Sequence, residues 1–147
     1  MNKRQLANVY AQVGLESSVL SASQHQLTTL LFDGALNALG RAAISMAHQD
    51  IINKGNMIAK AVAIIDTGLI QAIEPHAEDP LAGQLLSLFH YVVQQLMLAN
   101  LHNDRQKLDH CRELLQTIAA AWQTSLSQEG YHHGVTPGGT TKLGFTR

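Results

Sequence analysis

The stretch QLLSLFHYVVQQLMLANLHND, residues 84–104, decides the fold of this chain. At about 100° per residue its apolar side chains cover an arc of roughly 180° on a helical wheel, which is wider than one core-facing stripe requires. Polar residues collect on the opposite side, so the stretch predicts an amphipathic helix in water and not a membrane span. We expect this helix to pack within a bundle and to offer surface to another molecule. The residues of the arc are Leu85, Leu88, Phe89, Val92, Val93, Leu96, Met97 and Ala99.

Two asparagines, Asn100 and Asn103, fall within the same apolar arc near the end of this helix. A buried amide without hydrogen-bond partners costs on the order of 1–3 kcal/mol. We therefore expect both side chains to bond either to the corner of the chain that follows or to a bound partner.

Two helices are expected before this stretch. Ser23 and Gln26 form a capping-box pattern that predicts the start of the first helix, which ends near residues 48–50. A polar connection at residues 53–56 follows, and the apolar period of the second helix begins after it. Small side chains at two helical positions predict the close approach of a neighbouring helix: Gly34 and Gly68.

Two more helices complete the pattern. Asp79 followed by Pro80 suits the N-cap and first position of the helix that contains residues 84–104. Asp104 or Asn103 then caps a fourth helix, whose apolar stripe ends at residue 126. The four helices are each about 20–25 residues, or ~30–37 Å at 1.5 Å per residue. Long helices joined by short loops predict an all-α fold, an antiparallel up-down four-helix bundle.

The sequence divides into three parts. Residues 1–20 have sparse apolar positions without sustained period and form an N-terminal arm, which either lies against another surface or is a loosely ordered terminus. Residues 21–126 form the bundle. Residues 127–147 contain five glycines and one proline and predict a flexible C-terminal tail.

Composition excludes several classes of protein. Ten Lys and Arg nearly balance eleven Asp and Glu, and no basic face is long enough to follow a phosphate backbone, so nucleic acid is not an expected partner. The single cysteine, Cys111, has no internal partner for a disulfide. The basic N-terminus lacks the apolar run of a signal peptide or anchor. We expect a cytoplasmic protein without direct membrane insertion.

Chemical motifs are few. The one Glu-x-x-His pattern, Glu129 to His132, lies in the tail, whereas a di-iron bundle needs two such motifs on core faces and further carboxylates. We expect no metal, no other cofactor and no enzymatic activity. Without a convergent polar site, binding of an amphipathic or unfolded segment is the favoured function.

Two other functions remain open. A histidine phosphotransfer module would use His25 on the first helix, although Thr28 stands where that chemistry needs a basic residue and Thr29 where it needs a glycine. A generic helical adaptor would dimerise through the apolar arc. Phosphorylation of His25 would favour the first alternative, and dimerisation without affinity for any client segment would favour the second.

Five segments stand out in their order and spacing: YAQVGLES at 10–17, SASQHQL at 21–27, LFDGA at 31–35, LMLANLHND at 96–104 and AW at 121–122. Together they resemble the flagellar secretion chaperones of the FliS type, over about residues 7–126. The resemblance implies a non-enzymatic four-helix bundle that binds the disordered C-terminal segment of flagellin and prevents its premature polymerisation. It also implies delivery of flagellin to the type III export gate through the component FlhA.

The resemblance implies that the N-terminal arm covers the empty client groove through Tyr10 and leaves when client binds. Replacement of Tyr10 by Ala should then tighten client binding or increase self-association, and a homodimer is possible without client. On the helix of residues 84–104, the predicted client track contains Leu88, Phe89, Val92, Leu96 and Ala99, with the amides of Asn100 and Asn103. Ile65 and Leu69 of the second helix continue it, and for every apolar member the alternative role is ordinary bundle core.

Overall fold

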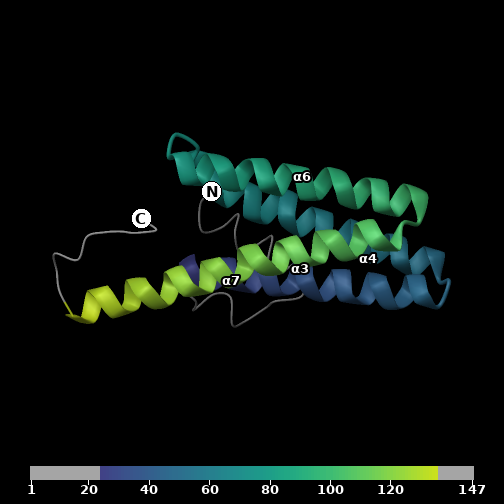
Figure 1. Cartoon of the computed structure of the whole chain (residues 1–147), viewed down its shortest axis with the longest axis horizontal. Helices are drawn as coiled ribbons and strands as arrows, with labels where there is room; N and C mark the ends of the chain where they lie inside the picture. The colour runs from purple at the N-terminus through teal and green to yellow at the C-terminus, as the bar shows by residue number, and fades with distance from the viewer. Residues whose placement is uncertain (1–23, 136–147) are drawn as a thin grey trace.

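The computed structural model describes residues 24–135, and this part of the chain is helical apart from short turns and has no strand. Four helical stretches lie lengthwise and antiparallel, joined at alternate ends (Figure 1). Each packs against two neighbours around one core, so the four-helix bundle is confirmed. The stretches are α3 (Gln24–Ala47), Ile51–His76, α6 (Pro80–His102) and α7 (Arg105–Val135).

The first turn lies earlier in the chain than the sequence predicted. The second stretch begins at Ile51, so residues 53–56 are helical and do not form the connection. Gln49 adopts a φ of 60° in the turn, and the Asp50 carboxylate accepts the backbone N–H of Asn53 at 3.1 Å as the N-cap. An aspartate that caps the first turn stabilises a helix start even where polar residues follow it. The predicted cap of α3, Ser23, lies outside the described residues.

The second stretch changes its helical period near its middle. Within it the π-helix η1 buries Leu69 and Gly68 against the core. A Cβ atom at Gly68 would lie 2.9 Å from Cδ1 of Leu31, which explains why the predicted close approach needs a glycine. The elements are α4 (Ile51–Ile64), η1 (Ile65–Ile70), α5 (Gln71–Ile73) and the 3-10 helix η2 (Glu74–His76).

Ile51–His76 is also the one helix in the described part of the chain that is long and apolar enough to cross a membrane by length and composition. Core helices of bundles satisfy the same test. Here the stretch packs against both α3 and α6 and supplies core residues such as Ile58 and Ile64. Its composition therefore does not indicate membrane insertion.

The predicted start of α6 is confirmed. The Asp79 carboxylate accepts the backbone N–H of Leu81 at 2.9 Å, and Pro80 occupies the first helical position. At the other end, Asn103 ends the helix in the left-handed conformation, with a φ of 53°. Asp104 then caps α7 by accepting the backbone N–H of Lys107 at 3.0 Å, as expected.

The last helix, α7, continues past residue 126 to Val135. The sequence prediction ended it where the apolar stripe ends. Extending an existing helix adds one hydrogen bond for each residue fixed, so a helix needs no apolar face to continue once it is nucleated. The predicted tail therefore begins with helical backbone, and residues 136–147 lie outside the described part.

Candidate functional site

Most residues of the predicted client track are buried in the bundle core. Phe89 is 1% exposed and the other five have no exposed surface, so their side chains pack against the protein itself in this structure. Leu88, by contrast, is 37% exposed. Of the predicted apolar track, Leu88 alone offers substantial surface to another molecule. The buried members are Ile65, Leu69, Phe89, Val92, Leu96 and Ala99.

The two asparagines serve the corner of the bundle. Lys54, only 3% exposed, donates from Nζ to the backbone oxygen of Asn100 at 3.0 Å and to its Oδ1 at 2.9 Å. The expected partner of the Asn100 amide is thus a lysine from α4. Asn103 acts through its backbone, since its left-handed conformation turns the chain and its N–H bonds to the Ala99 oxygen.

Sequence reasoning missed Lys54, which it placed in a polar connection. The ammonium group lies at the C-terminal end of α6, where the helix dipole and the last carbonyl groups favour a positive charge. No pattern in the local sequence distinguishes this lysine from an exposed one, because its acceptor lies 46 positions further along the chain.

Three contacts fix the register between α6 and α7. Lys107 Nζ donates to Gln95 Oε1 at 3.2 Å, and the rings of Tyr91 and His110 meet edge to face with centroids 6.4 Å apart. The Cys111 Sγ atom lies 4.0 Å from the oxygen of Val92. Continuing this antiparallel register, with helical steps of three and four residues, brings Leu88 opposite Leu114 and Leu85 opposite Ile118.

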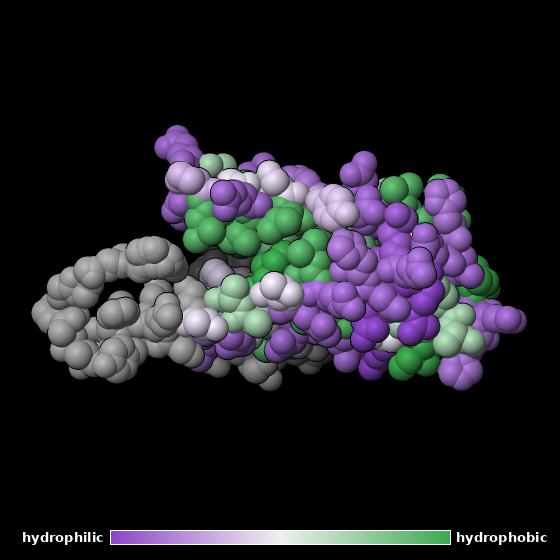
Figure 2. Space-filling view, viewed as in Figure 1, coloured by the Kyte–Doolittle hydropathy of each residue, from purple (hydrophilic) through white to green (hydrophobic). Residues whose placement is uncertain are grey.

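Beyond these contacts the two helices separate toward the start of α6 (Figure 1). Figure 2 shows apolar side chains gathered between them on this side of the molecule. Both helices contribute partly exposed apolar side chains to this end. We call this end the open end and define it by Leu85, Leu88, Leu114 and Trp122.

Aromatic rings form the base of the open end. The indole of Trp122 stacks on the His25 ring with centroids 4.3 Å apart, and Phe32 lies 6.4 Å from the same indole. Phe32 also contacts Phe89 at 6.0 Å, which links α3 to α6. The Trp122 Nε1 atom is buried and has no hydrogen-bond acceptor within the described structure. Buried indole N–H groups in folded proteins usually have an acceptor, so this unpaired group is a candidate donor to a bound molecule.

The remaining chemistry of the described residues is limited. Among residues 25–124, whose side chains the structure describes, no three His, Cys, Asp or Glu side chains are grouped closely enough to hold a metal ion. Burial raises the pKa of the Cys111 thiol to about 11, and the ammonium of Lys107 offsets part of this rise. Cys111 is therefore a neutral core thiol and not a nucleophile at neutral pH. His25, the phosphotransfer candidate, is half-buried against Trp122.

Apolar surface between two separating helices of a bundle suits the binding of an amphipathic segment of another protein. Comparison with known proteins then gives the family. The family model of the flagellar protein FliS matches residues 6–129, so this chain belongs to the FliS family. The members are flagellar secretion chaperones and not enzymes.

Curated relatives agree with this assignment. The flagellar secretion chaperone FliS of Escherichia coli K12 is 44% identical over 117 residues, which cover 80% of this chain and 86% of that protein. FliS of Salmonella typhimurium is 43% identical, over 78% of this chain and 84% of that protein. FliSB of Pseudomonas aeruginosa is 37% identical, over 77% and 89% respectively.

Proposed function

We propose that this protein is a cytoplasmic export chaperone that binds the disordered C-terminal segment of flagellin and prevents its premature polymerisation. The observation that carries the proposal is the open end, where two separating helices present partly exposed apolar side chains. Membership of the FliS family supports it. The protein delivers flagellin to the type III export apparatus, with FlhA as the receiving component.

The open end supplies what such a client needs. A segment that folds on binding loses conformational entropy and requires a long apolar contact to offset that loss. Leu85 and Leu88 on one wall and Leu114 on the other would accept alternate apolar side chains of the client. The N–H of Trp122 would donate to a client carbonyl and so fix the depth at which the segment lies.

The arm has a role in the same proposal. Tyr10 and the rest of residues 1–20 lie outside the described residues, so their covering of the empty groove stays a prediction. A tethered segment competes at a high effective concentration, so weak contacts suffice to cover apolar surface until client arrives. Loss of this cover would expose the open end and favour a homodimer in the absence of client.

The test compares two leucines of α6 at opposite ends of the helix. Leu88→Asp places a charge in the open end, and Leu101→Asp places the same charge on a side chain that is 75% exposed near the last turn. Isothermal titration with the flagellin C-terminal peptide should show at least about tenfold weaker binding for Leu88→Asp and less than about twofold for Leu101→Asp.

The alternatives make different predictions in the same titration. Equal affinity of the two variants would place the client elsewhere on the bundle. Absence of binding by the unaltered protein at high micromolar concentration would overturn the proposed function itself. Tight binding should carry a large negative heat-capacity change, because apolar surface leaves water.

A further inference from the structure

A second surface lies between the C-terminal half of α3 and the start of α7. It is an open groove of about 580 Å³. Small side chains of α3 such as Gly40 and Ala43 leave the space that forms it. Its charged and apolar lining includes Arg41, Ile44, His48, Arg105 and Arg112.

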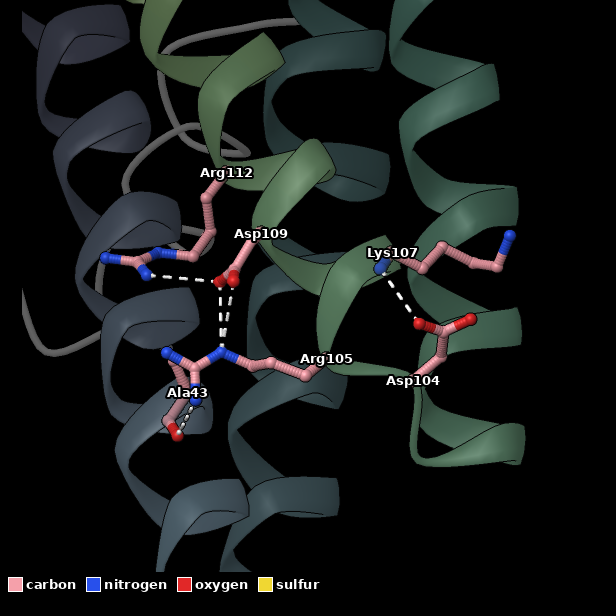
Figure 3. A network of polar contacts seen from close by, with 6 residues as sticks. All are labelled: Ala43, Asp104, Arg105, Lys107, Asp109 and Arg112. Atoms are coloured by element: carbon pink, nitrogen blue, oxygen red, sulfur yellow. Dashed lines mark hydrogen bonds and ion pairs between the residues drawn. The ribbon is translucent and has the colours of Figure 1, made fainter.

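The positive charge of this groove is only partly neutralised. The Asp109 carboxylate accepts from Arg105 Nε at 3.1 and 3.2 Å and lies 3.7 Å from Arg112 Nη1 (Figure 3). Arg105 also reaches across to the Ala43 oxygen of α3 at 3.4 Å. Arg41 is exposed and makes no ion pair within the described structure. One carboxylate thus pairs with two of the three guanidinium groups that line the groove, and no carboxylate lines the groove itself.

We propose that this groove binds an acidic segment of a partner protein. Guanidinium groups on both sides of the groove, from Arg41 and Arg112, would pair with two carboxylates of the segment in bidentate geometry. Ile44, 61% exposed beside Arg41, would contact an apolar side chain between them. The partner is therefore a peptide with acidic residues around at least one apolar residue.

The occupant is another molecule because the ends of this chain have the wrong charge. Residues 1–23 contain Lys3 and Arg4 against the single acid Glu16, and residues 136–147 contain Lys142 and Arg147 without any acid. A nucleic acid fits less well than an acidic peptide, since the formal net charge is −1 and the basic groups form one short cluster instead of a long stripe.

The groove is separate from the open end. Its lining comes from α3 and from the first turns of α7 and includes no residue of α6. Binding there leaves the proposed client surface free, so an acidic partner and an apolar client would bind at the same time. The inference therefore does not depend on the proposed function.

The test uses the full chain labelled with ¹⁵N and a synthetic peptide that repeats Glu-Glu-Leu, with a Gln-Gln-Leu peptide as reference. At low salt the acidic peptide should produce saturable shifts of the Nε–Hε signals of Arg41 and Arg112. The affinity obtained from these shifts should fall as the salt concentration rises. The combined variant Arg41→Gln/Arg112→Gln should weaken binding at least about tenfold. The glutamine peptide should not bind.

A matched control removes one positive charge elsewhere. Lys60 is an exposed residue of α4 outside the groove, so Lys60→Gln should weaken binding less than about twofold, against at least about threefold for Arg41→Gln. Equal losses for the two single variants would overturn the proposal, as would absence of saturation at millimolar peptide. Tighter binding of an oligonucleotide of equal charge would overturn it in favour of a phosphate site.

Discussion

The two ends of the bundle are held together by different forces. At the end where α6 turns into α7, which we call the closed end, hydrogen bonds from Lys54 join α4 to α6, and side chains of Asp50 and Asp104 cap the helices that follow the two turns. Asn53 of α4 adds a bond to Ser45 of α3 at 2.7 Å. At the open end the cap at Asp79 is local to the start of α6, and the contacts described between helices are among rings and aliphatic side chains.

This difference explains how one small bundle combines a fixed shape with an adaptable surface. Hydrogen bonds are directional, so the closed end sets the angle at which the helices leave each turn. Apolar contacts are not directional, so side chains at the open end can exchange their contacts for those of a client at little cost. Fixed turns at one end therefore make a separated pair of helices possible at the other.

The largest effect is expected from a substitution that unfolds the whole bundle and so disrupts both ends. Leu96 lies in the middle of α6 with no exposed surface, so a charge there is buried without a partner. Leu96→Asp should lower the free energy of unfolding by at least about 4 kcal/mol, or prevent cooperative folding. Urea unfolding followed by circular dichroism measures it. The control Gln94→Asp, on the exposed side of the same helix, should change stability by less than about 0.5 kcal/mol.

A second pair of variants tests the closed end. Asn100→Ala removes one acceptor from a buried ammonium and should cost about 2 kcal/mol of unfolding free energy. Lys54→Met removes the charge together with its need for acceptors and should cost less, because an apolar side chain of similar length suits a buried site. A larger loss for Lys54→Met would show that the bond itself, and not the avoidance of an unpaired charge, stabilises this corner.

Much of the fold could be predicted from local sequence signals. The caps at Asp79 and Asp104 and the extent of α6 depend on residues a few positions apart, and all agree with the structure. The requirement for a partner at Asn100 was predictable from its position in an apolar arc. The identity of that partner was not, since Lys54 reaches it only after the chain has folded.

The division of α6 between core and surface was beyond sequence reasoning. Leu88 and Leu96 belong to the same apolar arc, yet one is 37% exposed and the other has no exposed surface. Periodicity gives the direction of a side chain but not whether a neighbouring helix reaches it. α6 separates from α7 at the open end, and this separation leaves Leu88 exposed. It depends on how all four helices pack.

A smaller effect is expected from the indole of the open end. Trp122→Phe keeps a ring stacked near His25 but removes the N–H that has no acceptor in the described structure. Because no protein bond is lost, stability should fall by no more than about 1 kcal/mol. Affinity for the flagellin peptide should fall about fivefold, the value of one hydrogen bond. Unchanged affinity in titration would remove the indole N–H from the proposed contact.

The smallest effects come from two glycines that face different amounts of space. A Cβ atom at Gly34 would lie 3.5 Å from Ile64 Cδ1, an ordinary contact, so Gly34→Ala should stabilise the bundle by about 0.5–1 kcal/mol through helix propensity.

The same substitution at Gly68 meets Leu31 Cδ1 at 2.9 Å, and Leu31 has no exposed surface into which it could turn. Overpacking costs about 1–3 kcal/mol, which exceeds the gain in propensity, so Gly68→Ala should destabilise by about 1 kcal/mol. Parallel urea titrations of the two variants give the sign of each change. If Gly68→Ala stabilised as much as Gly34→Ala, Leu31 would have found another rotamer. The close approach of η1 to α3 would then be a consequence of the glycine and not the reason for it.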